Sequence, residues 1–288
     1  MNKSRLNKSF IKAVKNNKIK LIKSLINKGA DISFDDNFAL RYSTKNNNLE
    51  TIKILVNNGL SIHTCDDYIL RWGTRLGYYD MTKFAVDNGA YLDACNAYAV
   101  VWSVYHCDEN MLHLLLENGA KEHLDFIIHM CIFYGIENIL KLFIKYGHIN
   151  EKYRIKQCFK TTCRFERNNL FELLVENTED SKYFSYALVK SCKYNRLENV
   201  NCLIEKGADI HYKNERPLKY AYRKNNMEIV KLLVMKGADY KKLRISDVDI
   251  LKIFDEYDYY YYILKNRIEN RFRIDVNNLL IDNSINNL

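Results

Sequence analysis

Residues 49–59 read LETIKILVNNG, and close variants of this segment return as MLHLLLENG at 111–119, LENVNCLIEKG at 197–207 and MEIVKLLVMKG at 227–237. Within each variant the apolar residues recur three and four positions apart, which is the spacing of one face of an α-helix. Each variant ends in glycine, which easily adopts the left-handed conformation just past a last helical turn. The segment therefore predicts a short amphipathic helix that ends in a glycine cap.

The capping glycines recur at a nearly constant interval. Four of them lie 30 residues apart, the fifth follows after 28, and the last two are again 30 apart: Gly29, Gly59, Gly89, Gly119, Gly147, Gly207 and Gly237. The gap between the last two groups holds one more unit, in which Thr178 takes the place of glycine. Because a non-glycine residue in the left-handed conformation costs roughly 1 kcal/mol or more, we expect irregular stacking or a bend at this sixth unit.

A second apolar stretch precedes each glycine-capped helix after a short polar break. Examples are FALRYSTKN at 38–46, YILRWGTRL at 68–76 and YFSYALVKSCKYN at 183–195. One such helix pair cannot bury its apolar face alone, so neighbouring pairs must stack into a continuous core. We predict an all-α helical solenoid of about eight short repeats of about 30 residues over residues 1–245. The units end near residues 29, 59, 89, 119, 147, 178, 207 and 237.

The composition excludes several other classes of protein. The chain has 288 residues, of which 48% are hydrophobic and 27% charged, with ten glycines and one proline, so it is neither collagen-like nor a turn-dense β-protein. No apolar run approaches the roughly 18 residues of a membrane span, and the basic N-terminus lacks the apolar core of a secretory signal. We therefore expect a soluble intracellular protein without a membrane partner. Its eight cysteines are then free thiols, and none forms a Cys-x-x-Cys motif.

The net charge is +9, from 44 basic and 35 acidic residues. A basic balance ordinarily favours nucleic-acid binding. Asn, Lys, Ile and Tyr are all abundant, however, and all four are favoured by AT-rich codons. Part of the excess charge thus reflects codon usage, which makes a nucleic-acid ligand a weaker prediction.

The last unit resembles a known family. Residues 216–221, RPLKYA, are similar to the T-P-L-H-x-A signature of ankyrin repeats, and NNMEIVKLLVMKGAD at 225–239 closely resembles the second helix and the G-A-D ending of that family. The ending returns as KGADI at 28–32 and 206–210. The resemblance covers about residues 6–240, as eight ankyrin-type units, and extends to the short, divergent ankyrin repeats abundant in giant DNA viruses. It implies a protein-binding scaffold, located in the host cytoplasm if the protein is viral.

The chain departs from the family pattern at its loops and at its end. Pro217 is the only proline, and the stretch between Gly29 and Leu40 is three residues shorter than in a 33-residue repeat, so we expect stubby turns in place of extended fingers. Residues 246–288 lack the repeat and predict C-terminal capping helices followed by a polar tail. The alternative for this segment is a small effector module. The Leu-Pro motif of ubiquitin-ligase adaptors is absent from it, because no proline follows Pro217.

Alignment of the units brings both tryptophans, Trp72 and Trp102, into one column of the first helices. On a concave face they would be binding anchors of the kind that dominate interface energetics. Alternatively, the column packs between adjacent first helices as part of the core. The sequence leaves both interpretations open.

Three residues further along, the first helices carry a predominantly basic column. Six of its eight members are Lys or Arg, and the two in the middle are aromatic. The family resemblance implies that this position is exposed on the concave side, where an acidic protein surface would complement it; the alternative is a merely solvated face of a Lys-rich chain. The predicted binding residues are Lys45, Arg75, Tyr105, Phe133, Arg164, Lys193 and Arg223, together with Trp72 and Trp102.

No arrangement of residues in the sequence predicts catalysis. The seven histidines form no His-x-x-x-His pair, and the glycines form no phosphate-binding loop. We expect no enzymatic activity, no cofactor, no metal and no small-molecule substrate. The predicted function is non-catalytic binding of a protein partner with an acidic surface on the concave face. The alternatives are nucleic-acid binding through the basic stripe, and an adaptor that recruits a partner through its C-terminal segment.

Overall fold

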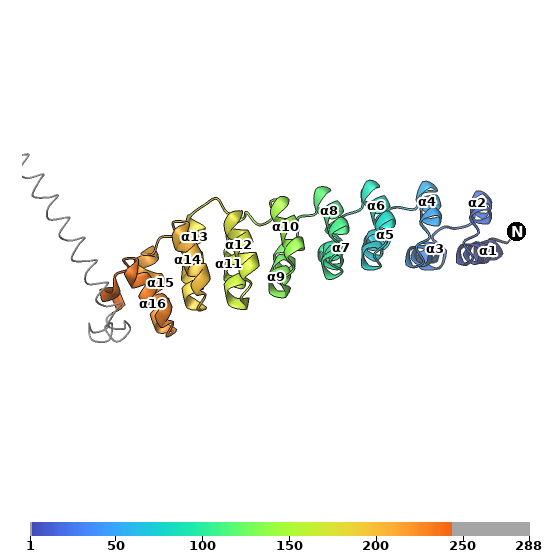
Figure 1. The fold of residues 1–288 in the computed structure, drawn as a ribbon. Helices are drawn as coiled ribbons and strands as arrows, with labels where there is room; N and C mark the ends of the chain where they lie inside the picture. Colours follow the sequence, from blue (N-terminus) through green and yellow to red (C-terminus); the bar gives the residue numbers. More distant parts are fainter. Residues whose placement is uncertain (1, 244–288) are drawn as a thin grey trace, which may run out of the picture. The chain divides into compact units, whose positions relative to one another are not determined.

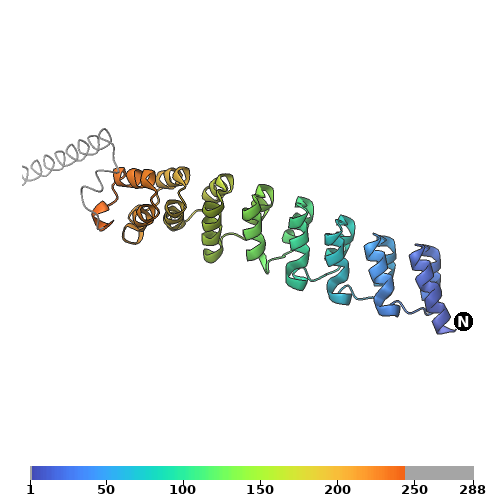
Figure 2. The same ribbon diagram turned by 90° about the horizontal axis from the view of Figure 1, so that it is seen from below.

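A computed structural model of the chain describes residues 2–243, which form sixteen α-helices and one 3-10 turn (Figures 1 and 2). The helices alternate as first and second members of eight pairs, one pair for each predicted unit. No strand occurs within residues 2–243, so the prediction of an all-α helical repeat protein is confirmed. The predicted capping helices at 246–288 lie outside the described residues.

The chain divides into two compact units, residues 1–158 and 159–288. In the first unit each first helix packs on the first helix of the next pair, and the second helices do likewise. The first helices are α1 (Lys3–Lys15), α3 (Phe34–Lys45), α5 (Thr64–Arg75), α7 (Ala94–Tyr105) and α9 (Leu124–Tyr134). The second helices are α2 (Ile19–Asn27), α4 (Leu49–Asn57), α6 (Tyr79–Asp87), α8 (Glu109–Glu117) and α10 (Glu137–Lys145).

The division between the compact units falls within α11 (Lys152–Phe165), the first helix of the sixth pair. The second unit continues with α12 (Asn168–Glu176), α13 (Lys182–Lys193), α14 (Leu197–Glu205), α15 (Tyr212–Arg223), α16 (Met227–Met235) and the 3-10 turn η1 (Tyr240–Leu243). Its helices pack as in the first unit, with α13 against α15 and α14 against α16.

The core follows the apolar columns of the sequence. Phe10, Leu40, Leu70 and Val100 of successive first helices are fully buried, and so are residues such as Ile52 on the second helices. Each of these side chains contributes roughly 1.5–3 kcal/mol by leaving water. The amphipathic pattern that identified the helices therefore also identifies the core.

The glycine caps have the conformation that the sequence predicts. Gly59 follows α4 with φ +97°, and the N–H of Leu60 behind it donates to the Leu55 carbonyl at 3.1 Å. Thr178 is different: it is absent from the residues with positive φ, and its hydroxyl donates to the Leu174 carbonyl at 2.6 Å. The prediction of left-handed strain at Thr178 was wrong, because a side-chain hydrogen bond ends α12 without a left-handed residue.

A second left-handed column, which the sequence analysis missed, ends the first helices. It consists of Asn17, Asn47, Gly77, Cys107, Gly135, Glu166, Asn195 and Asn225. Asparagine and glycine tolerate positive φ better than other residues do. Their recurrence every 30 residues marks the tight turn between the two helices of a pair.

Cys107 is an exception within this column, and we expect its replacement to stabilise the protein. The residue is exposed and has φ +52°. Replacing Cys107 by Gly removes the Cβ clash of the left-handed conformation, and we expect the free energy of unfolding to rise by about 0.5–1 kcal/mol after allowing for the greater freedom of unfolded glycine. Urea denaturation of the variant measures this change. Cys107→Ser keeps the Cβ and should leave stability unchanged; an equal gain in that control would contradict the backbone argument.

Four of the first helices, α3, α5, α7 and α15, begin with a short turn of three consecutive left-handed residues. These are residues 35–37, 65–67, 95–97 and 213–215, with φ between +50° and +61°. No finger-like strand hairpin occurs in residues 2–243, as the shortened loops predict. A cation further along the same helix donates to the carbonyls of three of these turns: Arg41 to Asp35, Arg71 to Cys65 and Asp66, and Lys219 to Asn214.

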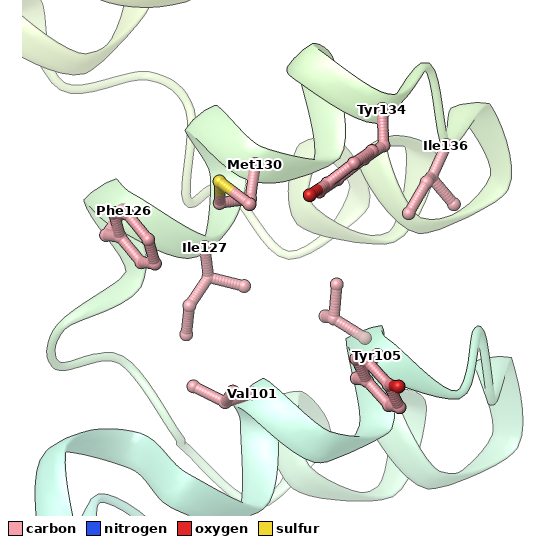
Figure 3. A pocket seen from close by; sticks show the side chains of 8 residues that line it. Val101, Tyr105, Phe126, Ile127, Met130, Tyr134 and Ile136 are labelled. Atoms are coloured by element: carbon pink, nitrogen blue, oxygen red, sulfur yellow. The ribbon is translucent and has the colours of Figure 1, made fainter.

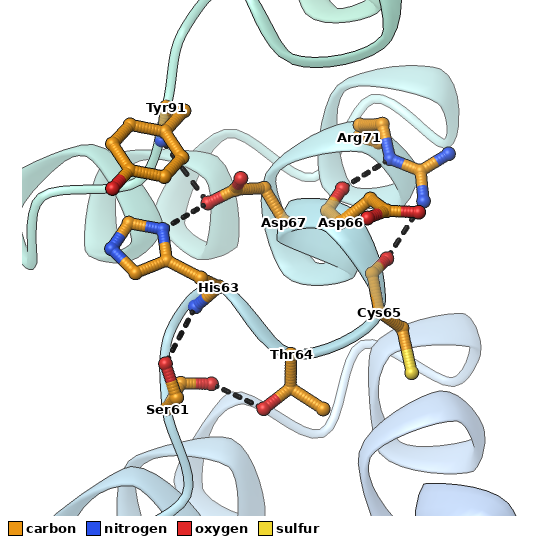
Figure 4. Close-up of polar contacts among 8 residues, drawn as sticks. All are labelled: Ser61, His63, Thr64, Cys65, Asp66, Asp67, Arg71 and Tyr91. Carbon is orange, nitrogen blue, oxygen red and sulfur yellow. Dashed lines mark hydrogen bonds and ion pairs between the residues drawn. The ribbon is translucent and has the colours of Figure 1, made fainter.

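A buried polar side chain at the start of a first helix links each of three units to the next loop. Figure 4 shows the best-connected case, in which Asp67 accepts from the N–H of Tyr91 at 3.1 Å and lies 2.9 Å from Nδ1 of His63. Asn7 accepts from the N–H of Asp31 and Ser185 from that of Asp209 in the same manner. The acceptor and donor are always 24 residues apart, and we call this bond the inter-repeat staple.

Candidate protein-binding site

The predicted binding residues of the first unit lie at the C-terminal ends of successive first helices, where they form alternating cations and aromatic rings. Lys45 Nζ lies 4.9 Å from the ring centre of Trp72, and the Arg75 guanidinium lies 4.6 Å from Trp72 and 4.9 Å from Trp102. We call Lys45, Trp72, Arg75 and Trp102 the cation–aromatic ladder. Such contacts are worth about 0.5–1 kcal/mol at exposed sites and more when partly desolvated.

Arg75 is fixed at the centre of this ladder. Its Nη1 donates to the Tyr98 hydroxyl at 3.2 Å, while its carbonyl oxygen lies 2.9 Å from Nε2 of His106. With rings on two sides and a hydrogen bond from its Nη1, the side chain of Arg75 has reduced rotamer freedom left to lose on binding.

Both tryptophans are half-buried, a state that neither of the two interpretations from the sequence describes alone. They bridge adjacent first helices through Arg75, as the packing interpretation requires, but neither belongs to the buried core. Tyr68 stacks on Trp72 at 5.5 Å, and Tyr98 lies 5.9 Å from Trp102. Each tryptophan is thus a partly exposed ring that packs against a tyrosine of its own helix.

The two aromatic members of the stripe are exposed. Tyr105 is 72% exposed and contacts the Trp102 ring edge-on at 5.1 Å, so it extends the ladder by one ring. Phe133, on the next first helix, is 37% exposed and contacts Tyr134. The stripe therefore changes from cationic on α5 to aromatic on α7 and α9.

In the second unit the stripe residues do not form a ladder. Lys193 lies over the Tyr220 ring at 5.9 Å, beside Arg216 at 5.6 Å, whereas Arg164 lies over its own neighbour Phe165 and Arg223 is exposed. Burial, with the positive charges of Lys193 and Lys160 nearby, lowers the pKa of Lys190. The hydrogen bond from Arg216 lowers the pKa of Tyr220. This face of the second unit is thus a looser group of cations around tyrosines.

Four of the cysteines are inert by virtue of their position. Burial raises the pKa of the Cys131 and Cys158 thiols to about 12 and that of Cys163 to about 11, and burial also raises the pKa of Cys192. A thiol with such a pKa carries almost no thiolate at neutral pH and packs as a small apolar side chain.

Among residues 2–243, no group of three or more His, Cys, Asp or Glu side chains is arranged to hold a metal ion. None of the helices described above is both long and apolar enough to cross a membrane.

Comparison with protein families matches residues 10–96 and 159–243 to ankyrin repeats (3 copies). The match omits the fourth and fifth pairs, where the stripe turns aromatic and the glycine spacing shortens to 28. No curated protein gave a significant match to the chain. The paired helices, the glycine caps and the family match, which together span more than half of the sequence, show that the chain belongs to the ankyrin repeat family.

Proposed function

We propose that this protein is a non-catalytic scaffold that binds an acidic surface of a partner protein through the first helices of its first unit. Ankyrin repeats are generally protein-interaction modules, and proteins built from them are typically non-catalytic. The observation that carries the finer proposal is the cation–aromatic ladder of Lys45, Trp72, Arg75 and Trp102.

The ladder combines two properties of a binding site. Tryptophan and arginine are the residues most enriched among energetic hot spots of protein interfaces. Here they are already ordered by contact with one another, so a partner loses less binding free energy to side-chain ordering. Carboxylates of the partner would meet a fixed guanidinium, and its apolar groups would meet the exposed ring faces.

We also propose which side of the stack binds the partner and where the protein is located. We place the binding face on the concave side of the stack and the protein inside the cell, in the host cytoplasm if its resemblance to giant-virus ankyrin proteins reflects its origin. A nucleic acid is the second candidate ligand, because the stripe is basic. An adaptor role for residues 246–288 concerns a segment outside the described residues.

Affinity capture from a cell lysate tests the proposal. The wild-type chain is compared with the double variant Lys45→Glu and Arg75→Glu, and Arg164→Glu forms a separate arm for the second unit. The matched control, Lys20→Glu with Lys53→Glu, makes the same charge change on the exposed side of the second helices α2 and α4. Circular dichroism confirms that each variant folds before capture.

We expect a nuclease-resistant protein partner that is lost with the Lys45 and Arg75 variant and kept by the control. Capture is carried out at about 50 mM and about 200 mM salt, because affinity for nucleic acid falls steeply over that range. Recovery of only salt-labile nucleic acid would favour the second candidate. Identical partners for the ladder variant and the control would show that the first-helix face is not the binding site.

A further inference from the structure

An apolar cavity of about 450 Å³ opens between α7 and α9, beside the end of the ladder (Figure 3). Its walls are Val101, Val104 and Tyr105 from α7, Phe126, Ile127, Met130 and Tyr134 from α9, and Ile136 from the following turn. The only polar side-chain groups among these residues are the two tyrosine hydroxyls. All of the lining belongs to the first compact unit.

Two substitutions within the repeat explain why the space is empty. Val101 occupies the position at which Arg41 and Arg71 reach back to the left-handed turns of their own units. Met130 occupies the position of Trp72 and Trp102. Between α5 and α7 the corresponding arginine, Arg71, lies 5.7 Å from the Tyr98 ring centre, and the corresponding indole is Trp102. A short aliphatic and a narrow unbranched side chain replace them between α7 and α9.

The cavity lies in the most exposed apolar surface of the described residues. Ten large apolar side chains are exposed in residues 2–243, and five of them belong to α7 and α9: Val101, Tyr105, Phe126, Phe133 and Tyr134. Contiguous apolar surface of this kind marks interaction sites on soluble proteins.

The charges around the cavity select the chemistry of an occupant. Tyr105 forms one wall and contacts Trp102, which in turn contacts the Arg75 guanidinium, so one cation lies beyond this rim, behind the indole. On the side of α9, Asp125 is paired with Arg154 at 2.6 Å, which compensates its negative charge. A side chain that fills the cavity should therefore be apolar, and the residues next to it in sequence should be acidic.

We propose that this cavity is the specificity pocket of the binding face, and that it takes one bulky aliphatic or aromatic side chain from an acidic segment of the partner protein. The proposal rests on the proposed function, because the cation–aromatic ladder would bind the acidic residues of the same partner segment. Within the chain itself, residues 265–273, KNRIENRFR, are a poor occupant, since they carry four basic residues and one acidic residue. Residues 247–258, DVDILKIFDEYD, carry five acidic residues and one basic residue around apolar side chains, so they are the competing occupant that the experiment must test.

A random-peptide display library selected on the wild-type protein provides the probe. We expect the enriched peptides to share one Leu, Ile, Phe or Trp beside two or more Asp or Glu residues. In Met130→Trp the indole found on the neighbouring helices fills the cavity, and affinity should fall about tenfold or more. Val101→Asp places a carboxylate in the cavity and serves as the second blocking variant, in case Met130→Trp does not fold. Tyr79→Ala, on α6 outside the pocket, is the matched control and should bind as wild type.

Each alternative outcome overturns the proposal. These outcomes are a selection that enriches no peptide, one that enriches peptides without acidic residues, and one whose peptides bind the blocked variants equally well. Binding of a synthetic peptide of residues 247–258 that is lost in Met130→Trp would assign the pocket to the chain itself. The lysate capture keeps the two proposals apart: a partner lost with the Lys45 and Arg75 variant but retained by Met130→Trp refutes the pocket and preserves the proposed function.

Discussion

Replacing Asp67 by Ala is expected to lower the free energy of unfolding by about 2–3 kcal/mol. The carboxylate is buried and accepts from the backbone N–H of Tyr91 in the next loop, besides pairing with His63. Alanine would leave that N–H without its acceptor, and it would itself occupy a left-handed conformation at φ +55° that aspartate tolerates better. Urea denaturation gives the total effect, and hydrogen exchange at the Tyr91 amide reports on the staple directly.

Asp67→Asn is the matched control for this prediction. Asparagine keeps the acceptor oxygen and suits the left-handed conformation, and Asn7 already performs the same task in the first unit. We expect a loss of at most about 1 kcal/mol and a Tyr91 amide that stays protected. If the Asn variant were as unstable as the Ala variant, the attraction between the carboxylate and His63 would be the main contribution, and the staple a minor one.

Trp72→Ala and Trp102→Ala are each expected to lower the free energy of unfolding by about 2 kcal/mol. Truncation of a fully buried large side chain typically costs about 3–5 kcal/mol, and these half-buried rings have less to lose. Because both rings contact Arg75, removing the second should cost less than removing the first, and the double variant should fall short of the sum by about 0.5–1 kcal/mol.

Chemical denaturation of the two single variants and the double variant measures these quantities. Tyr79→Ala removes a ring that is 40% exposed and lies outside the ladder, so a change below about 0.5 kcal/mol is expected there. Leu70→Ala, at a fully buried position of α5, gives the reference for a core residue. Tryptophan variants as unstable as Leu70→Ala would mean that the rings are core residues. Additive losses would mean that Arg75 does not couple them.

The helix pairs and their glycine caps were predictable because both are local. Apolar spacing identifies a helix face, and glycine past the last turn has one strong structural meaning. The second left-handed column was visible as well, since Asn17, Asn47, Asn195 and Asn225 keep the same spacing as the capping glycines. It was missed because asparagine also recurs in many other places in this chain. The strain predicted at Thr178 was wrong because a threonine hydroxyl can bond a carbonyl of its own helix.

The candidate site was predictable in its positions and not in its contacts. The column containing Trp72 and Trp102 could be aligned from the repeat, but its half-buried state depends on Arg75, which lies on α5 with Trp72 and contacts Trp102 of α7. The inter-repeat staple could not be predicted from one unit alone, because its donor lies 24 residues away in the neighbouring unit. The cavity is harder still to foresee, because it arises where Val101 and Met130 do not fill space that only the assembled helices define.

The inter-repeat staple has a consequence for how such a chain can change length. Each staple joins one unit to its immediate successor, and the interval of 24 residues is the same at both ends of the described chain. A genetic duplication of thirty codons would therefore reproduce both the donor and the acceptor, and a deletion of thirty would remove both together. Unequal recombination can lengthen or shorten the array without leaving a buried amide unbonded, which is a freedom that ordinary globular domains lack.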